Sequence, residues 1–290
     1  MDLAALVGLA IRASIFLIVF GLGLGSTRAD ALSLLHRPRL LVRSLVSMNA
    51  VMPLVAAGLA QAFDFHQAVK ITLIALAVSR VPPILPRKEL KAGGPRSYAI
   101  GLLVVAAVLA IVLVPFSVEA IGRLFQTEVR VPASAVARLV AITVLVPIVA
   151  GIIVRSLAPA LAARLSGPIL LGATVLLGIG TLLILFQAWP AAMTLVGNGH
   201  VLAIAAFVVI GLAVGHLLGG PDPDERAVLA LSTATRHPGV ALAIAGITFP
   251  AQKLVMGAVL LYLLMATVLS IPYVSWRRRQ LAGAPRSAQT

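Results

Sequence analysis

The chain has 290 residues, of which 60% are hydrophobic and only 11% are charged. Soluble domains usually carry about a quarter of charged residues, so this composition excludes an ordinary soluble domain and indicates a protein embedded in a lipid bilayer. The absence of cysteine excludes disulfides and cysteine-ligated metals. The net charge of +14 does not indicate nucleic-acid binding, because the basic residues lie between apolar segments rather than along one face.

Apolar runs of about 20 residues predict transmembrane helices. Taken in chain order there are nine, and the third and the eighth are interrupted by prolines. The expected fold is an all-α polytopic membrane protein with helices over residues 3–25, 42–63, 68–90, 97–117, 134–156, 168–188, 199–218, 227–249 and 252–275.

Basic residues are concentrated in alternate loops, and such loops face the cytoplasm. This pattern predicts an external N-terminus and a cytoplasmic C-terminus in an integral protein of the plasma (inner) membrane. Lys88, Glu89 and Lys91 are interpreted as part of a solvated cytoplasmic face. The basic residues of the predicted cytoplasmic set are Arg28, Arg37, Arg39, Arg43, Arg87, Lys88, Lys91, Arg96, Arg155, Arg164, Arg226 and Arg277–Arg279.

Two similar short segments interrupt the third and eighth helices. Ser79-Arg80-Val81-Pro82-Pro83 and Thr235-Arg236-His237-Pro238-Gly239 each place a hydroxyl, an arginine and a proline within an apolar run. Arginine is costly inside a bilayer, and proline removes a backbone donor from a helix. Carriers with inverted repeats build their central site from two interrupted helices of this kind.

The chain also divides into two related halves. In each half the arginine is followed, after nearly the same interval, by a proline near the end of the next helix, Pro115 or Pro272. Corresponding helices cross the membrane in opposite directions, which predicts an inverted repeat. The expected parts are a first half of four helices (1–117), an external connector (118–133), a second half of five helices (134–276) and a basic cytoplasmic tail (277–290).

Short motifs spread over most of the chain resemble the bile acid:sodium symporter family, which belongs to a wider group with arsenite-efflux and auxin-efflux carriers. The resemblance implies ten helices, or nine when the first is missing, with two unwound helices that cross near the midplane. It also implies a secondary transporter. The motifs are Phe20–Leu24, Met52-Pro53-Leu54, Gly93-Gly94 and Thr233–Ala243.

The chain departs from the family pattern where sodium is expected to bind. Ser232, Arg236 and His237 stand where sodium-dependent members have Glu, Gln and Asn, and Met48 stands where they have a glutamine. Sodium needs oxygen ligands. The oxygens that remain for it are freed backbone carbonyls and the hydroxyls of Ser79, Ser232, Thr233 and Thr235.

Two interpretations of the arginines stay open. Arg80 and Arg236 either bind the carboxylate of a substrate with parallel hydrogen bonds, or cap the carbonyls that the prolines free. Asn49, Ser79, Thr235 and His237 are the other candidate substrate contacts, and His237 is also a candidate for proton coupling. The helix breaks are assigned to Pro82, Pro83, Pro238 and Gly239.

The sequence therefore predicts a secondary carrier that moves a small organic anion by alternating access, with sodium as the coupling ion that the resemblance implies. The alternative is a proton-coupled or uncoupled organic-anion efflux carrier. A channel would need a continuous polar stripe, and a membrane enzyme would need paired catalytic groups. Neither pattern is present in the apolar segments, and no cofactor is expected.

Overall fold

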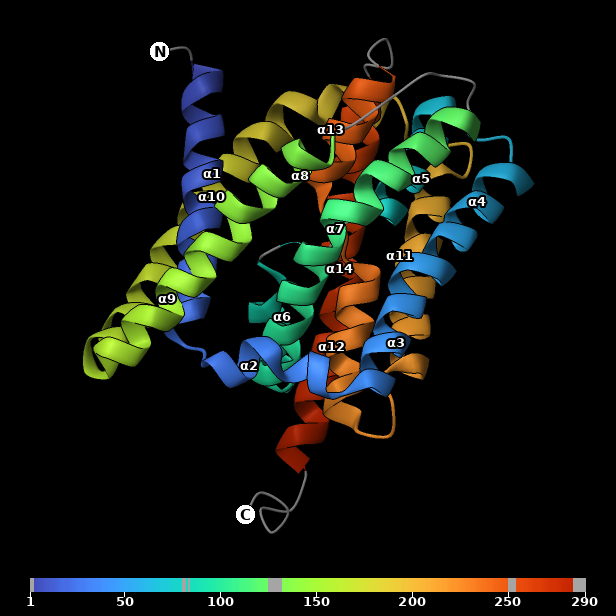
Figure 1. Cartoon of the computed structure of the whole chain (residues 1–290). Coiled ribbons are helices and arrows are strands. Elements are labelled where there is room, and N and C mark those ends of the chain that lie inside the picture. The colour runs from blue at the N-terminus through green and yellow to red at the C-terminus, as the bar shows by residue number, and fades with distance from the viewer. Residues whose placement is uncertain (1–2, 80–81, 83, 125–131, 250–253, 284–290) are drawn as a thin grey trace.

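The computed structural model describes residues 3–79, 82, 84–124, 132–249 and 254–283. Across these ranges all regular structure is helical (Figure 1). This confirms the predicted all-α class.

Seven helices are long and apolar enough to span a bilayer. Two of them contain a π-helical turn, η2 or η3, which links two α-helical parts. The seven are α1 (Leu3–Leu24), α3–η2–α4 (Pro38–Val46, Ser47–Val51, Met52–Ala62), α7 (Arg96–Leu124), α8–η3–α9 (Ala133–Val140, Ala141–Leu145, Val146–Leu157), α10 (Pro159–Met193), α11 (His200–Leu218) and α14 (Val255–Gly283).

The other two predicted helices are pairs of shorter helices. The first pair is α5 (Gln67–Val78) with α6 (Leu85–Lys91), and the second is α12 (Pro223–Ala234) with α13 (Pro238–Thr248). Length and composition thus identify seven spans among the described residues, and the predicted count of nine is not confirmed. The difference falls on the two interrupted segments, whose halves are too short to span a bilayer alone.

Several helices extend beyond their predicted ends. The helix α10 begins at Pro159, before the predicted 168, and α14 continues into the predicted basic tail as far as Gly283. Helical hydrogen bonding does not stop at the edge of an apolar run. A short linking segment, α2 (Arg28–Leu32) and η1 (Ser33–His36), joins α1 to α3.

Each π turn is followed, after one further residue, by a proline. Pro53 is the second residue of α4 after η2, and Pro147 is the second residue of α9 after η3. Proline lacks the N–H that an α-helical turn needs, and its ring clashes with the carbonyl four residues earlier. A widened π turn at this point relieves the clash without ending the helix.

The long helices form two groups. We call α1, α9 and α10 the side bundle, and α3–α7 with α11–α14 the core bundle (Figure 1). Within the side bundle α1 and α9 lie so close that a Cβ added at Gly151 would stand 2.4 Å from the carbonyl oxygen of Phe20. Small residues permit this backbone approach between membrane helices.

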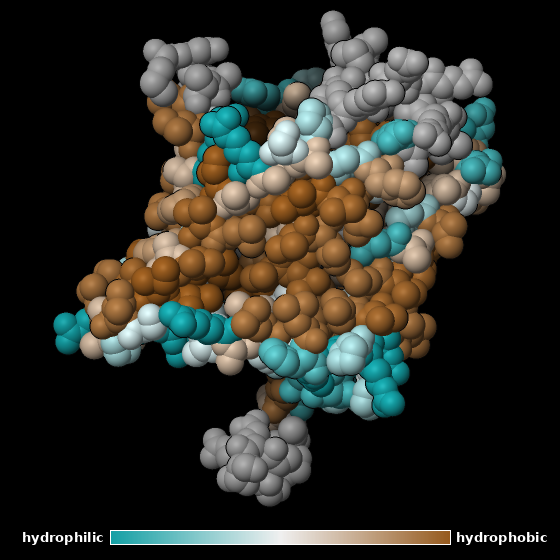
Figure 2. All heavy atoms as spheres, viewed as in Figure 1, coloured by the Kyte–Doolittle hydropathy of each residue, from teal (hydrophilic) through white to brown (hydrophobic). Residues whose placement is uncertain are grey.

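The surface is that of a membrane protein. On the face drawn in Figure 2 a broad hydrophobic zone separates more hydrophilic rims. Large apolar side chains are exposed in this fold, among them Leu54, Phe116, Phe186 and Leu202. Such side chains are stable facing lipid, and the long helices satisfy their own backbone groups there. The chain is therefore an integral membrane protein.

Many of the basic residues lie at one end of the molecule. The start of α1 and the end of α14 lie at opposite ends of the molecule (Figure 1). The segment α2, the helix α6 and the start of α12 lie together at the end where α14 finishes. These elements carry many of the basic residues of the predicted cytoplasmic set.

Candidate functional site

The second interrupted segment has a well-defined break. Helix α12 ends at Ala234, Thr235 and His237 are extended (φ −101° and −80°), and α13 begins at Pro238. Proline fits the first position of a helix because no partner is needed there for its missing N–H. The His237 side chain caps α13, since its Nδ1 accepts a hydrogen bond from the backbone N–H of Val240 at 3.3 Å. Gly239, the second residue of α13, is exposed.

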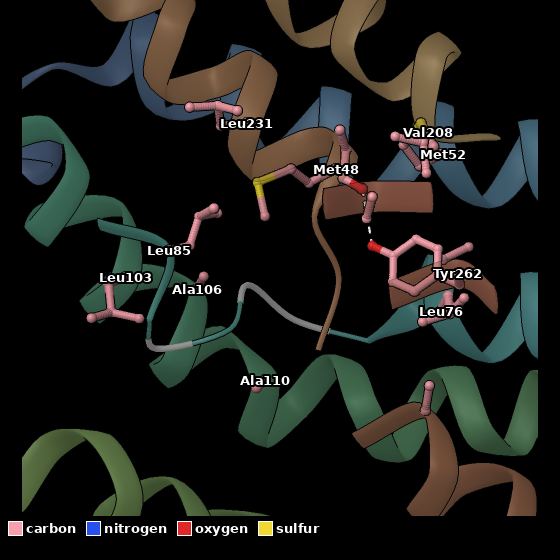
Figure 3. Packing of buried hydrophobic residues seen from close by; sticks show 14 of the residues in the cluster. Met48, Met52, Leu76, Leu85, Leu103, Ala106, Ala110, Val208, Leu231 and Tyr262 are labelled. Atoms are coloured by element: carbon pink, nitrogen blue, oxygen red, sulfur yellow. Dashed lines mark hydrogen bonds between the residues drawn. The ribbon is translucent and has the colours of Figure 1, made fainter. Parts of the chain in front are cut away.

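A tyrosine on α14 is hydrogen-bonded to the backbone at this break. The backbone N–H of Arg236 donates to the hydroxyl of Tyr262 at 2.5 Å, and that hydroxyl donates to the carbonyl of Ala234 at 2.9 Å. Tyr262 is fully buried, and Figure 3 shows it in the hydrophobic cluster with Met48 and Leu76. It thus satisfies two backbone groups that a continuous helix would have paired. The sequence interpretation missed Tyr262, although a tyrosine in the middle of an apolar span was a signal.

The first interrupted segment meets the second directly. Ser79 is the extended residue that ends α5, and its hydroxyl donates to the carbonyl of Leu76 at 2.8 Å. The same hydroxyl accepts a hydrogen bond from the backbone N–H of His237 at 3.1 Å. The two breaks therefore touch, and we call this region the crossing. Pro82 is buried, whereas Arg80, Val81 and Pro83 lie outside the described residues.

Arg236 is the largest fully buried side chain in the described structure, with 1% of its surface exposed. Its guanidinium donates to backbone carbonyls: from Nε to Thr233 at 3.1 Å, from Nη2 to Met48 at 3.0 Å, and from Nη1 to Ser79 at a longer 3.4 Å. This is the geometry of a group that caps freed carbonyls. Substrate contact by Arg236 stays a prediction.

Two of the hydroxyls predicted as sodium ligands, those of Ser232 and Thr233, have other partners. Ser232 donates to the carboxylate of Glu89 at 2.5 Å, and the Thr233 hydroxyl is hydrogen-bonded to that of Ser47 at 2.7 Å. Glu89 is only 1% exposed, so its interpretation as part of a solvated face is wrong. The reason is that α6 packs against α12, which covers the side of α6 that carries Glu89. Lys88 is half-buried and Lys91 is exposed.

Thr235 has an unusual environment. Its hydroxyl oxygen is buried but has no hydrogen-bond partner among the described residues, and the hydroxyl of Thr72 on α5 is in the same state. A buried polar group without a partner costs about 1–3 kcal/mol, so such a group usually meets water or a ligand. Asn49 lies on the π turn η2, next to Met48, and its side-chain amide donates to the carbonyl of Leu45 at 3.2 Å.

A separate pocket of about 300 Å³ opens between the two bundles. It lies at the basic end of the molecule, where α1 ends and where α7 and α10 begin, and it contains two arginines, Arg96 and Arg155. The other lining residues are Leu24, Gly25, Pro159, Ala163 and Ser166. Arg96 and Arg155 form no salt bridge with a described carboxylate. The pocket therefore carries positive charge and has no described acidic side chain in its lining.

These features define the class of protein. Two interrupted helices that meet inside a bundle of long apolar helices are the architecture of a membrane carrier. The described residues contain no cluster of three or more His, Cys, Asp or Glu that could hold a metal ion.

Comparison of the sequence with known protein families identifies the family of this chain. Residues 13–193 match the family described as the Sodium Bile acid symporter family, and the chain belongs to it. This confirms the resemblance seen in the sequence, and the members of this family are transporters rather than enzymes. No curated protein matches the chain. The matched residues include the first interrupted segment but end before the second, where Arg236 lies.

Proposed function

We propose that this protein is a secondary transporter of a small organic anion that works by alternating access, with the side bundle and the core bundle moving against each other. The observation that carries the proposal is the hydrogen bond between the two helix breaks, from His237 to Ser79, in a member of a symporter family. Broken helices supply backbone groups for a substrate in the interior of a carrier.

Several features favour an anion. The pocket between the bundles contains Arg96 and Arg155. At the crossing, the N-terminus of the eleven-residue helix α13 contributes positive potential next to the hydroxyl of Thr235, which has no partner among the described residues. We assign the substrate contacts to Thr235, Asn49, Ser79, His237 and the arginine at position 80. The basic end of the molecule then faces the cytoplasm.

The coupling ion defines two candidate mechanisms. The family name points to sodium. A proton-coupled or uncoupled carrier is the second candidate, and the burial of Glu89 favours it. Carboxyl groups inside membrane carriers are typical members of proton pathways. Glu89 is hydrogen-bonded to Ser232 of the other interrupted segment. A change in the protonation of Glu89 would therefore alter this hydrogen bond and affect the segment that forms the crossing.

Counterflow in proteoliposomes tests the proposal. Vesicles loaded with one unlabelled organic anion should accumulate the same labelled anion, and a panel of monocarboxylates, dicarboxylates and sterol-type anions would identify the class. Counterflow needs no ion gradient, so it separates carrier activity from coupling. A panel of organic cations is the negative control. Exchange of cations and of no anion would contradict the proposal.

The two arginines of the pocket provide the matched variants. Arg96→Ala and Arg155→Ala should each raise KM about tenfold, because a charge-assisted hydrogen bond is worth about 1.5–3 kcal/mol. Arg164→Ala is the control, since Arg164 is an exposed arginine of α10 that does not line the pocket. An equal change in all three variants would point to surface charge rather than to the pocket.

A further inference from the structure

The crossing contains a positive charge that belongs to the protein itself. The guanidinium of Arg236 joins three separate segments, since its carbonyl partners Thr233, Met48 and Ser79 belong to α12, η2 and the end of α5. It is buried from solvent, and these three partners are all backbone oxygens. A cation surrounded by carbonyl oxygens at the ends of broken helices is in the position where carriers bind a coupling ion.

The residues at this point do not fit a sodium ion. The C-terminal end of a helix carries partial negative charge, and Ser79 lies at the end of α5 while Thr233 lies in the last turn of α12. Both carbonyls already accept hydrogen bonds from the guanidinium. Three of the four hydroxyls that remained as ligands are engaged as well. Ser232 is bonded to Glu89 and Thr233 to Ser47, and the hydroxyl of Ser79 is bonded to Leu76 and His237. The hydroxyl of Thr235 has no partner among the described residues, but one oxygen alone cannot supply the several oxygen ligands that a hard cation needs.

We propose that Arg236 is a built-in cation that takes the place of the coupling sodium ion at the crossing. The inference deepens the proposed function and rests on it where transport is concerned. A guanidinium stays charged at physiological pH and cannot dissociate from the chain. The carbonyls are thus satisfied in every step of the cycle, and sodium neither binds at the crossing nor drives transport through it.

The first test measures sodium binding without any substrate. The purified full chain is unfolded thermally in sodium chloride and in choline chloride at equal ionic strength, and radioactive sodium binding is measured in parallel. A ligand that binds only the folded state raises its stability. We expect the unaltered protein to unfold at the same temperature in both salts and to bind no sodium.

Variants at the crossing supply the comparison. In Arg236→Gln the carbonyls lose their cation, so this variant should unfold at a lower temperature and should regain stability specifically with sodium. Arg236→Lys keeps a positive charge and should not respond to sodium. Ser79→Ala is the matched control, because it removes the hydroxyl that bonds His237 but keeps the carbonyl that faces Arg236, and it should not respond to sodium either.

The results of the sodium-binding and unfolding measurements can support or overturn the proposal. Stoichiometric sodium binding by the unaltered protein, or a rise in its unfolding temperature with sodium, would overturn the proposal. The proposal would also be overturned if Arg236→Gln folds but its unfolding temperature does not rise with sodium, because the carbonyls would then not form an ion site. If Arg236→Gln does not fold, the test rests on the unaltered protein and on Arg236→Lys. Sodium binding by either of them refutes the built-in cation. The absence of sodium binding and of stabilisation by sodium in both supports it.

Counterflow separates this inference from the proposed function. Anion exchange of equal rate in sodium and in choline supports both. Exchange that requires sodium keeps the carrier function and removes the built-in cation. If no anion exchanges while the sodium-binding results are as expected, the carrier proposal fails and the assignment of Arg236 stands.

Discussion

The core bundle and the side bundle are held together in different ways. In the core bundle buried polar side chains bond across helices: Glu89 to Ser232, Ser47 to Thr233, and Arg236 to two carbonyls of other segments. In the side bundle one side-chain hydrogen bond, from Ser166 on α10 to the carbonyl of Gly21 on α1, accompanies close backbone packing at Gly151. A polar group is expensive in a membrane interior, and proteins keep it there for function. The contrast is consistent with the proposed substrate contacts at the crossing in the core bundle, while the side bundle contributes Arg155 to the pocket.

The largest effect is expected from Arg236→Met. The substitution keeps a long side chain but leaves three carbonyls without a partner. Losing them should lower the free energy of unfolding by roughly 3–5 kcal/mol and abolish transport. Unfolding in detergent, followed by circular dichroism, measures the change. Arg164→Met is the control on an exposed site. Equal stability of the two variants would show that the core network is dispensable.

A bulky residue at the closest helix contact should break the side bundle. Gly151→Leu would force a Cβ to within 2.4 Å of the carbonyl oxygen of Phe20. Overpacking of this kind costs about 1–3 kcal/mol or more. Gly172→Leu on α10 is the control, because a Cβ at Gly172 meets nothing within 4 Å. We expect thermal unfolding to separate the two variants clearly. A Gly151 variant as stable as the control would mean that packing is not what joins α1 to α9.

Two substitutions of the buried Glu89 can separate the effect of its charge from the effect of its hydrogen bond. Glu89→Leu removes the partner of the Ser232 hydroxyl and should cost about 1–2 kcal/mol of unfolding free energy. Glu89→Gln keeps a hydrogen-bonding group and should unfold close to the unaltered protein. If protons couple transport through Glu89, Glu89→Gln should still exchange anions in counterflow but should lose the dependence on a pH gradient. A retained dependence would exclude Glu89 as the proton carrier.

The smallest effect on stability is expected at Thr235. Thr235→Val keeps the shape of the side chain and removes a hydroxyl that has no partner among the described residues. Stability should stay the same or rise slightly, because an unpaired buried polar group is lost. Transport should weaken through a higher KM, since we assign this hydroxyl to the substrate. An unchanged KM would remove Thr235 from the site.

The main features of the fold were predictable because they depend on local chemistry. A bilayer demands long apolar helices, and the composition showed them without any knowledge of contacts. The two breaks were evident because proline and arginine are rare inside such helices. The family resemblance rested on motifs such as Phe20–Leu24, which lie within the matched residues. Helix ends were less accurate, as in α10, because hydropathy marks the edge of the membrane rather than the last hydrogen bond.

The sequence by itself thus determined the membrane class, the positions of the breaks and the kind of side chains near them. Only the tertiary structure decided which groups these side chains meet. Arg236 finds its carbonyls on α5 and η2, Glu89 is covered by α12, and Tyr262 reaches the break from α14. Each partner lies far away in the chain. The physical reason is that burial and hydrogen bonding inside a helical bundle are set by packing between distant segments, which no local pattern records.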